Sequence, residues 1–253
     1  MRLPSLSALS RSILTPMHLS RARWFILFLL SVIILTPTLF TFLVNLAFAQ
    51  PAPPPFNSAL AARVAAFSPA VVSVNAPPEV GSGIILTPDG LMITASHVVA
   101  HASTISVYIV ARGTFSATLL VLDPTHQQAL LQIENAHDLP TLDLATAPPF
   151  LHEAVAVLGY PGGLGDQPRV TTGNLTKLNA SVTVRVDASH TQTLSSLLVA
   201  NAPVSGGESG GPLLTANGQV LGMLVAGGGG LEYATIVNLC SLSSSLSLSL
   251  ACP

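Results

Sequence analysis

The segment from Ala70 to Val237 alternates short runs of β-favouring residues with turn residues, and this alternation limits the folds open to the chain. Strands of this length and spacing are typical of an all-β sandwich or barrel. The loop 145–153 divides the runs into two halves of similar length, so two β units are expected. The predicted strands are 70–76, 83–87, 91–94, 104–110, 115–123, 129–134, 154–160, 168–172, 181–186, 195–201, 219–226 and 232–237.

The N-terminal part contains an uncharged apolar run, residues 24–48, that is long enough to cross a bilayer. Only basic charges precede it, so the positive-inside rule keeps the N-terminus in the cytoplasm. The run ends in AFA at residues 47–49, a small-x-small pattern that a signal peptidase could cut. An uncleaved signal anchor and a cleaved signal peptide over residues 24–49 both stay open, and both place the rest of the chain outside the cytoplasm. The basic residues 1–23 also resemble a transit peptide.

The rest of the chain divides into a linker, a folded domain and a tail. Residues 50–57 form a Pro-rich spacer that its composition predicts to be extended. The predicted domain covers residues 58–237 and begins with a short amphipathic helix, because apolar residues recur there at helical spacing. These apolar residues are Leu60, Val64 and Phe67.

The tail, residues 238–253, is rich in Ser and Leu and fits a helix somewhat better than a strand. It contains Cys240 and Cys252, which an exported compartment would allow to form a disulfide; two unpaired thiols are an equal alternative. After Gln50 only five basic residues face all eleven acidic ones. No basic patch is therefore available, and nucleic acid is excluded as a partner.

The strongest local signal is the sequence GESGGP at residues 207–212. A serine flanked by glycines can sit on a tight turn that exposes its Oγ and directs its own N–H, and that of Gly207, to one point. Two such donors make an oxyanion hole, which is commonly worth several kcal/mol in a transition state. Serine also needs a base that takes its proton. The candidate base is His97 in the sequence TASHVV, residues 94–99, and the candidate nucleophile is Ser209.

These segments together resemble the trypsin-fold serine proteases, and within them the HtrA/Deg group of exported proteases. The resemblance implies two six-stranded antiparallel β-barrels with the active site in the cleft between them. It further implies that His97 is the general base, that Ser209 is the nucleophile, and that the N–H groups of Gly207 and Ser209 form the oxyanion hole. Many relatives also carry a PDZ domain, which is not expected here. The matching pieces are 64–74, 81–99, 123–133, 154–164, 200–214, 218–223 and 232–237.

One position departs from the family pattern where the chemistry is most sensitive. Gln127 stands where the family places the aspartate of the triad, and Gln128 replaces a usual apolar neighbour. The apolar residues 129–131 fix the register, so a shifted alignment restores no aspartate. Asp123 lies four residues upstream, beyond a proline turn, which makes it a poor substitute. His126 is expected on the face opposite to Gln127 if the segment is extended.

Glutamine can affect the histidine in two opposite ways. The Gln127 carbonyl could accept a hydrogen bond from Nδ1–H of His97 and keep the useful tautomer, or its NH₂ group could face the ring and enforce the other tautomer. Neither arrangement supplies the negative charge that stabilises the imidazolium. Glu208, where most of the group has asparagine, adds an unhelpful charge unless its side chain turns away or finds a partner. The sequence therefore predicts a Ser–His dyad with strongly reduced activity.

The predicted function is that of a serine-type endopeptidase acting on unfolded or damaged extracytoplasmic proteins. The alternative is a non-catalytic pseudoprotease that binds peptides or partner proteins in its cleft. The pocket for the side chain before the scissile bond carries no charge among its predicted residues, which favours a small or medium apolar side chain. These predicted substrate-binding residues are Pro203, Val204, Ser205, Val225, Ala226 and Gly227.

No cofactor and no metal are expected. His97 and His101 have the i, i+4 spacing of two zinc ligands, but Val98 stands where a zincin needs glutamate, and no third ligand is evident. The expected partners are polypeptide substrates and, through residues 24–48, a membrane. Trimers are common in the HtrA/Deg group, so an oligomer stays open.

Overall fold

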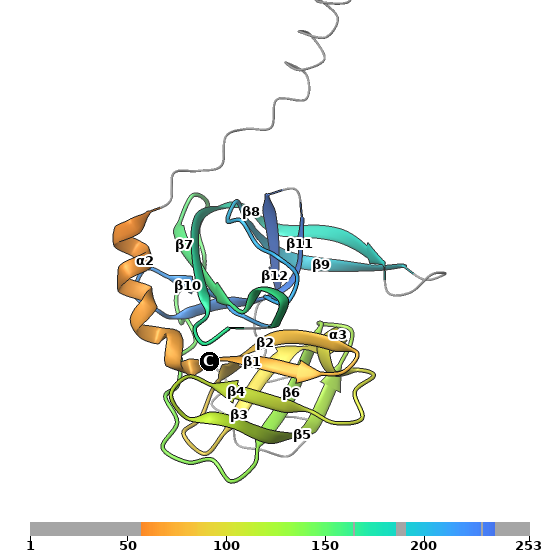
Figure 1. Ribbon diagram of the computed structural model, residues 1–253. Coiled ribbons are helices and arrows are strands. Elements are labelled where there is room, and N and C mark those ends of the chain that lie inside the picture. The colour runs from red at the N-terminus through yellow and green to blue at the C-terminus, as the bar shows by residue number, and fades with distance from the viewer. Residues whose placement is uncertain (1–56, 164, 186–190, 229, 236–253) are drawn as a thin grey trace, which may run out of the picture. The chain divides into compact units, whose positions relative to one another are not determined.

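The computed structural model describes residues 57–163, 165–185, 191–228 and 230–235. Within these residues, twelve strands form two closed six-stranded barrels, so the predicted all-β fold with two halves is confirmed (Figure 1). The first barrel has the strand order β1-β2-β3-β6-β5-β4, with antiparallel pairing throughout. Its strands are β1 (Val71–Ala76), β2 (Glu79–Ile85), β3 (Leu91–Ala95), β4 (Ser106–Ile109), β5 (Gly113–Asp123) and β6 (Gln128–Ile133).

The second barrel repeats this pattern with the order β10-β11-β12-β9-β8-β7. The hairpin of β8 and β9 extends well beyond the barrel wall, as Figure 1 shows. The strands of the second barrel are β7 (Ala154–Gly159), β8 (Arg169–Arg185), β9 (Thr191–Ala200), β10 (Pro212–Thr215), β11 (Val220–Gly228) and β12 (Leu231–Thr235).

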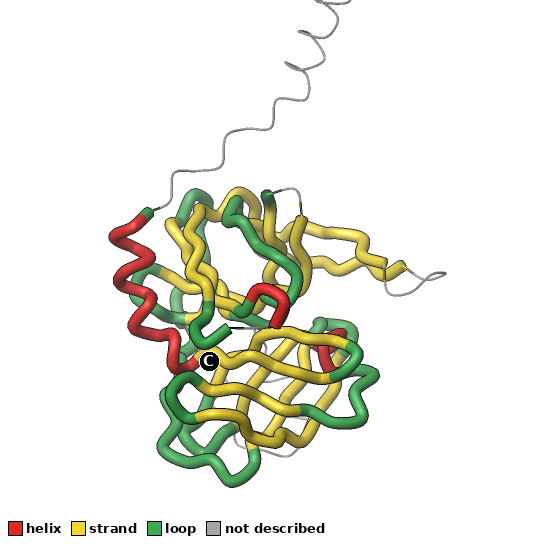
Figure 2. The backbone as a smooth tube through the Cα atoms, in the orientation of Figure 1, coloured by secondary structure: helices red, strands yellow, loops and turns green. Residues whose placement is uncertain are grey.

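Within the described residues, helical structure is confined to short segments, which are red in Figure 2. The predicted N-terminal helix is α2 (Ser58–Val64), and the side chain of Asn57 caps it by accepting a hydrogen bond of 3.0 Å from Leu60 N–H. It continues as the 3₁₀ turn η1 (Ala65–Ala70) and leads directly into β1. Two more short segments lie close to the candidate site. They are α3 (Ser96–Val99) after β3 and η2 (Pro161–Gly163) after β7.

Apolar side chains fill both barrels. Ile84, Met92 and Leu131 are fully buried in the first barrel, as are Val157 and Leu213 in the second. Burying each side chain of this size stabilises the fold by about 1.5–3 kcal/mol. The predicted strands read as nearly continuous apolar runs because a barrel strand also packs outward, against loops and the other barrel.

The predicted strand boundaries are wrong in two places. Segments 168–172 and 181–186 belong to one strand, β8, which absorbs the intervening residues through register shifts, with Asn179 in a left-handed conformation (φ 57°). In addition, β10 was not among the predicted strands, because its four residues directly follow the glycines of the GESGGP sequence.

Several predicted segments lie outside the described residues. They are the apolar run 24–48, almost all of the linker 50–57, and the tail 238–253 with its two cysteines. In the described ranges, no helix has both the length and the apolar character that a membrane span requires.

Candidate active site

His97 is held in place by the end of β3 and by the turn before β6. Ala95 ends β3 opposite Gln128, and the buried Ser96 then begins α3. The N–H of Ser96 donates a hydrogen bond of 3.1 Å to the carbonyl of Gln127. This bond ties the start of α3 to the turn that carries Gln127. The exposed His97 therefore projects from a rigid junction into a cavity of about 340 Å³.

Gln127 lies against the ring of His97, and its amide has one defined orientation. Its Oε1 is 3.2 Å from Nδ1 of His97. Its Nε2 donates to the carbonyl of Pro124 at 3.0 Å and to Oε1 of Gln192 at 3.1 Å. A flipped amide would place Oε1 against these two acceptor oxygens, so the network opposes the flip. The orientation thus favours the tautomer with the proton on Nδ1, which leaves Nε2 free to act as a base.

Asp123 does not take the place of the absent triad aspartate. Its carboxylate accepts hydrogen bonds from the backbone N–H of His126 at 3.1 Å and from Nδ1 of the same residue at 2.6 Å. Burial raises the pKa of Asp123, but these contacts outweigh burial and hold the pKa below its usual value. The segment is not extended, so the condition for placing His126 on the face opposite to Gln127 is not met: the residues before Gln127 form a turn, and Gln127 itself is left-handed (φ 57°).

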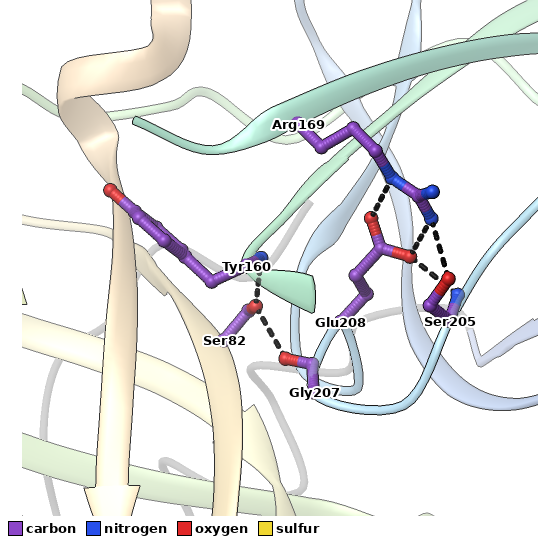
Figure 3. A network of polar contacts seen from close by, with 6 residues as sticks. All are labelled: Ser82, Tyr160, Arg169, Ser205, Gly207 and Glu208. Carbon is purple, nitrogen blue, oxygen red and sulfur yellow. Dashed lines mark hydrogen bonds and ion pairs between the residues drawn. The ribbon is translucent and has the colours of Figure 1, made fainter. Parts of the chain in front are cut away.

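Ser209 lies on a tight turn of the second barrel that is bound to the first barrel through one residue. Ser82 in β2 donates from its N–H to the carbonyl of Ser209 at 2.8 Å, and from its Oγ to the carbonyl of Gly207 at 2.9 Å. The N–H of Tyr160 in turn donates to Oγ of Ser82 at 2.9 Å (Figure 3). Gly210 has φ 90°, and a Cβ there would lie 2.0 Å from the carbonyl of Ser82. Only glycine therefore fits this close approach.

Two backbone N–H groups of the turn are left free to bind a ligand. The carbonyl of Gly206 accepts a hydrogen bond of 2.7 Å from η2, so in the planar trans peptide the N–H of Gly207 points the opposite way. The carbonyl of Glu208 accepts one of 3.0 Å from Gly211, so the N–H of Ser209 likewise points away. Neither N–H has a partner within the part of the chain that the structure describes.

Glu208 finds the partner that the sequence left open. Its side chain is fully buried, and its two carboxylate oxygens bind Arg169 at the start of β8, through Nε at 3.0 Å and a terminal nitrogen at 2.5 Å. The N–H of Ser205 donates to the same carboxylate at 2.6 Å, and Arg169 also donates to Oγ of Ser205 at 3.1 Å (Figure 3). This network holds the residue between Gly207 and Ser209 in one conformation. The charge of Glu208 is therefore directed away from Ser209.

The cavity beside Ser209 has a volume of about 160 Å³. Four of the six predicted pocket residues, Val204, Ser205, Ala226 and Gly227, line this cavity. Val225 lines the larger cavity beside His97 instead, and Pro203 lines neither of the two. Both cavities are lined by residues of β11, the larger by Val225 and the smaller by Leu224 and Ala226. In the described chain, no hydrogen bond joins His97 to Ser209. The cavity beside Ser209 is lined by Val204, Ser205, Gly206, Ser209, Leu224, Ala226 and Gly227.

Sequence reasoning missed three residues that support the site. Ser82, Arg169 and Gln192 come from β2, β8 and β9, and each binds a residue far away in the sequence. Of these, only Arg169 could have been expected from the sequence, because a buried acid such as Glu208 requires a cation and the domain has few basic residues. The other two are ordinary polar residues whose partners become visible only in three dimensions.

Comparison with known proteins agrees with this geometry. The model of the family described as trypsin-like peptidase domain matches residues 81–223. The chain belongs to this family. The chain is 30% identical to the periplasmic serine endoprotease DegP of Escherichia coli over 148 residues, 58% of this chain and 30% of that protein. It is 31% identical to the mitochondrial serine protease HTRA2 of Bos taurus over 144 residues, 56% of this chain and 30% of that protein.

The structural comparison extends the similarity over both barrels. The active form of the Rv3671c protease from M. tuberculosis superposes with a TM-score of 0.66 and 26% identity, covering 78% of this chain and 90% of that one. The chain spans about a third of the length of the curated relatives that it matches. The peptidase domain is thus the part shared with these HtrA/DegP homologues.

Proposed function

We propose that the chain is a serine endopeptidase in which Ser209 is the nucleophile and His97 the general base. The observation that carries this proposal is the contact between Nδ1 of His97 and Oε1 of Gln127, because it directs the basic Nε2 away from the buried amide. Ser209 lines a second cavity, and two free backbone donors flank Glu208. A nucleophile, a base and an oxyanion site are the parts that peptide-bond hydrolysis requires.

In the proposed mechanism, Oγ of Ser209 attacks the carbonyl carbon of the peptide while Nε2 of His97 takes its proton. The N–H groups of Gly207 and Ser209 hold the oxyanion that forms. The C–N bond then breaks, His97 gives the proton to the leaving amine, and an acyl-enzyme remains. Water attacks this ester through the same steps and restores the serine.

Gln127 makes this enzyme slow in our proposal. Its carbonyl holds the ring in the required tautomer, but it carries no charge to stabilise the imidazolium formed during attack. Exchanging the aspartate of a triad for its amide lowers kcat about 10⁴-fold where the amide enforces the wrong tautomer. The orientation of Gln127 removes the tautomer part of this loss. We therefore expect a rate between that of an intact triad and that of an amide-substituted one.

The place of action follows from the same proposal. Residues 24–48 would export the domain as a signal anchor or a signal peptide, residues 50–57 would serve as a spacer, and residues 58–237 would act outside the cytoplasm. The E. coli relative is named as a periplasmic enzyme, which supports this location. We propose unfolded or damaged extracytoplasmic proteins as the substrates, because a cavity of about 160 Å³ beside Ser209 has room for a side chain of an extended segment and not for a folded protein.

A fluorophosphonate probe tests the proposal directly, because it reacts with an activated serine. The full chain should be labelled slowly, and Ser209→Ala should abolish the labelling. Labelling as fast as that of a relative with an intact triad would refute the reduced rate. No labelling over hours would favour the second candidate, a pseudoprotease that binds peptides in the cleft. The observation that favours this candidate is the uncharged Gln127 beside His97.

A further inference from the structure

A polar cavity of about 320 Å³ lies outside the proposed mechanism. It shares no lining residue with the cavities beside His97 and Ser209. One wall comes from β1, β2, β4 and β5 of the first barrel. The other wall comes from the loop that follows β7 in the second barrel, through Gly163, Gly165 and Asp166. The cavity is therefore a separate place at which a ligand could contact both barrels.

The strand register gathers hydroxyl and amide groups on the wall of the first barrel. Ser73 of β1 lies directly opposite Tyr108 of β4. Asn75 lies opposite Ser106 in the same pair of strands. On the other side of β4, Thr114 of β5 lies opposite Tyr108. Side chains that are opposite each other, or two residues apart on one strand, share a face of the sheet, so all five polar side chains belong to this wall.

Most of these polar groups are not used by the fold. Ser73 is the exception, because its Oγ donates a hydrogen bond of 2.7 Å to the carbonyl of Gly163. A Cβ on Gly163 would lie 2.4 Å from Cβ of Val80, so the loop also packs closely against β2. The two walls are thus fixed to each other before any ligand arrives. Four side chains of the wall have no hydrogen bond with another described residue: Asn75, Ser106, Tyr108 and Thr114.

Asp166 gives the cavity a negative charge that nothing balances. Of the described residues that line the cavity, Asp166 alone is charged, and it forms no ion pair or hydrogen bond with another described residue. Burial raises the pKa of the Tyr160 phenol, and the charges of Tyr108 and Asp166 raise it further, so both groups lie close to Tyr160. The buried Glu232 of β12 also lacks a hydrogen-bond partner in the described ranges, but it lines none of these three cavities.

We propose that this cavity binds a guanidinium or alkylammonium group, such as the end of an arginine or lysine side chain of a polypeptide. The cation pairs with the carboxylate of Asp166, and its remaining N–H groups donate to the hydroxyl and amide oxygens of the opposite wall. An anion is disfavoured, because Asp166 repels it and no basic residue lines the cavity. The site gives a polypeptide a second contact apart from Ser209, and binding there does not require the proposed catalysis.

Binding of two matched peptides to the full-length Ser209→Ala variant tests the inference, because this variant cannot cleave them. One is a fluorescein-labelled Gly-Arg-Gly peptide, and in the other citrulline, an uncharged isostere, replaces arginine. Fluorescence anisotropy should show that the arginine peptide binds about 10-fold more tightly, as expected for hydrogen bonds to a charged group. Raising the salt from about 20 to about 500 mM should remove most of this preference, since the cavity is open to solvent.

Asp166→Asn should abolish the preference for arginine. Thr114→Lys provides a second variant, because it brings a cation of the chain itself into the cavity and should exclude the arginine peptide. Asp138→Asn is the matched control, since it removes an acid whose side chain is 89% exposed and lies outside the cavity, and it should leave the preference unchanged.

Agmatine, a guanidinium compound without peptide groups, separates the two sources of the cation. Competition as strong as that of the peptide assigns the site to small free cations, and weaker competition assigns it to polypeptides. Equal affinity of the two peptides, or a preference that persists in Asp166→Asn, would overturn the inference. If the native chain is not labelled at Ser209 but the arginine preference is found, the proposed catalysis fails and this site stands.

Discussion

Replacing Gln127 by aspartate should convert the proposed dyad into a triad and raise the rate of hydrolysis. Gln127 is 7% exposed and has φ 57°, a conformation that aspartate adopts more readily than glutamine. The shorter side chain would give up the hydrogen bonds to Pro124 and Gln192. The Oε1 of Gln192 then loses its donor, while its NH₂ group, which donates to the carbonyl of Pro124 at 3.0 Å, would lower the cost of burying the new carboxylate only after the Gln192 amide turns over.

The expected gain follows from the separation of the charges. A carboxylate at this position would lie about 4 Å from the imidazolium of His97, and at an effective dielectric constant of about 20 the attraction is about 4 kcal/mol. Partial burial of the carboxylate removes about 1–2 kcal/mol of this gain. About 2–3 kcal/mol remains for the transition state, which corresponds to a rate increase of about 30- to 150-fold.

The assay is the second-order rate constant of fluorophosphonate labelling, together with kcat/KM on an unstructured protein such as casein. Ser209→Ala in the Gln127→Asp background provides the control, and it should remove all activity. Gln127→Leu should lower the already slow rate further, because it cannot hold the tautomer. If Gln127→Asp leaves the rate unchanged while the protein stays folded, some other group already stabilises the imidazolium and the electrostatic reasoning is refuted.

Three more perturbations follow from the contacts of the site. Arg169→Met leaves Glu208 buried without its cation, and should lower the free energy of unfolding by about 3 kcal/mol in urea titrations and slow probe labelling. Gln192→Leu removes an acceptor that orients Gln127, and should slow labelling about 5-fold, since one neutral hydrogen bond is worth about 1 kcal/mol. Glu232→Met should flatten the pH dependence of stability measured by thermal unfolding.

The sign of the last effect follows from proton binding. The pKa of Glu232 is raised in the folded state, so between its ordinary value of 4.5 and that raised pKa the native chain binds one proton more than the unfolded chain. The contribution of Glu232 to stability is therefore fully present below about pH 4.5 and falls by about 1.4 kcal/mol per pH unit as the pH rises through this window. The control for Arg169→Met is Arg63→Met, at an exposed arginine of α2, which should leave the free energy of unfolding within about 0.5 kcal/mol. An unchanged pH profile in Glu232→Met would contradict the assigned burial.

The barrels were predictable because each strand leaves a local trace of β-favouring residues between turn residues. The two errors also have local causes. Residues 173–180 include Gly173, Asn174 and Asn179, which favour turns and therefore separated 168–172 from 181–186 in the prediction, whereas the register shifts that let β8 continue through them depend on its partner β9. The short β10 was hidden by the glycines before it, which mark the turn and not the strand.

The site was predictable only as far as its residues lie in specific motifs. His97, Ser209 and the position of Gln127 could be predicted from the sequence, but the orientation of the Gln127 amide could not. That orientation depends on Gln192, which lies 65 residues away on the β8–β9 hairpin. The buried Glu232 was likewise invisible, because an acid in a predicted strand is ordinarily assigned to the solvent face.

The two hydrogen bonds from Ser82 to the turn of Ser209 affect the stage of folding at which the proposed activity could begin. Its N–H and its hydroxyl bind carbonyls of the turn that carries Ser209, which belongs to the other barrel. In a newly made chain whose barrels are each folded but not yet docked, that turn lacks both hydrogen bonds from Ser82. In the proposed enzyme, hydrolysis would therefore begin only once both barrels are docked, which would protect neighbouring chains that are still folding from premature cleavage.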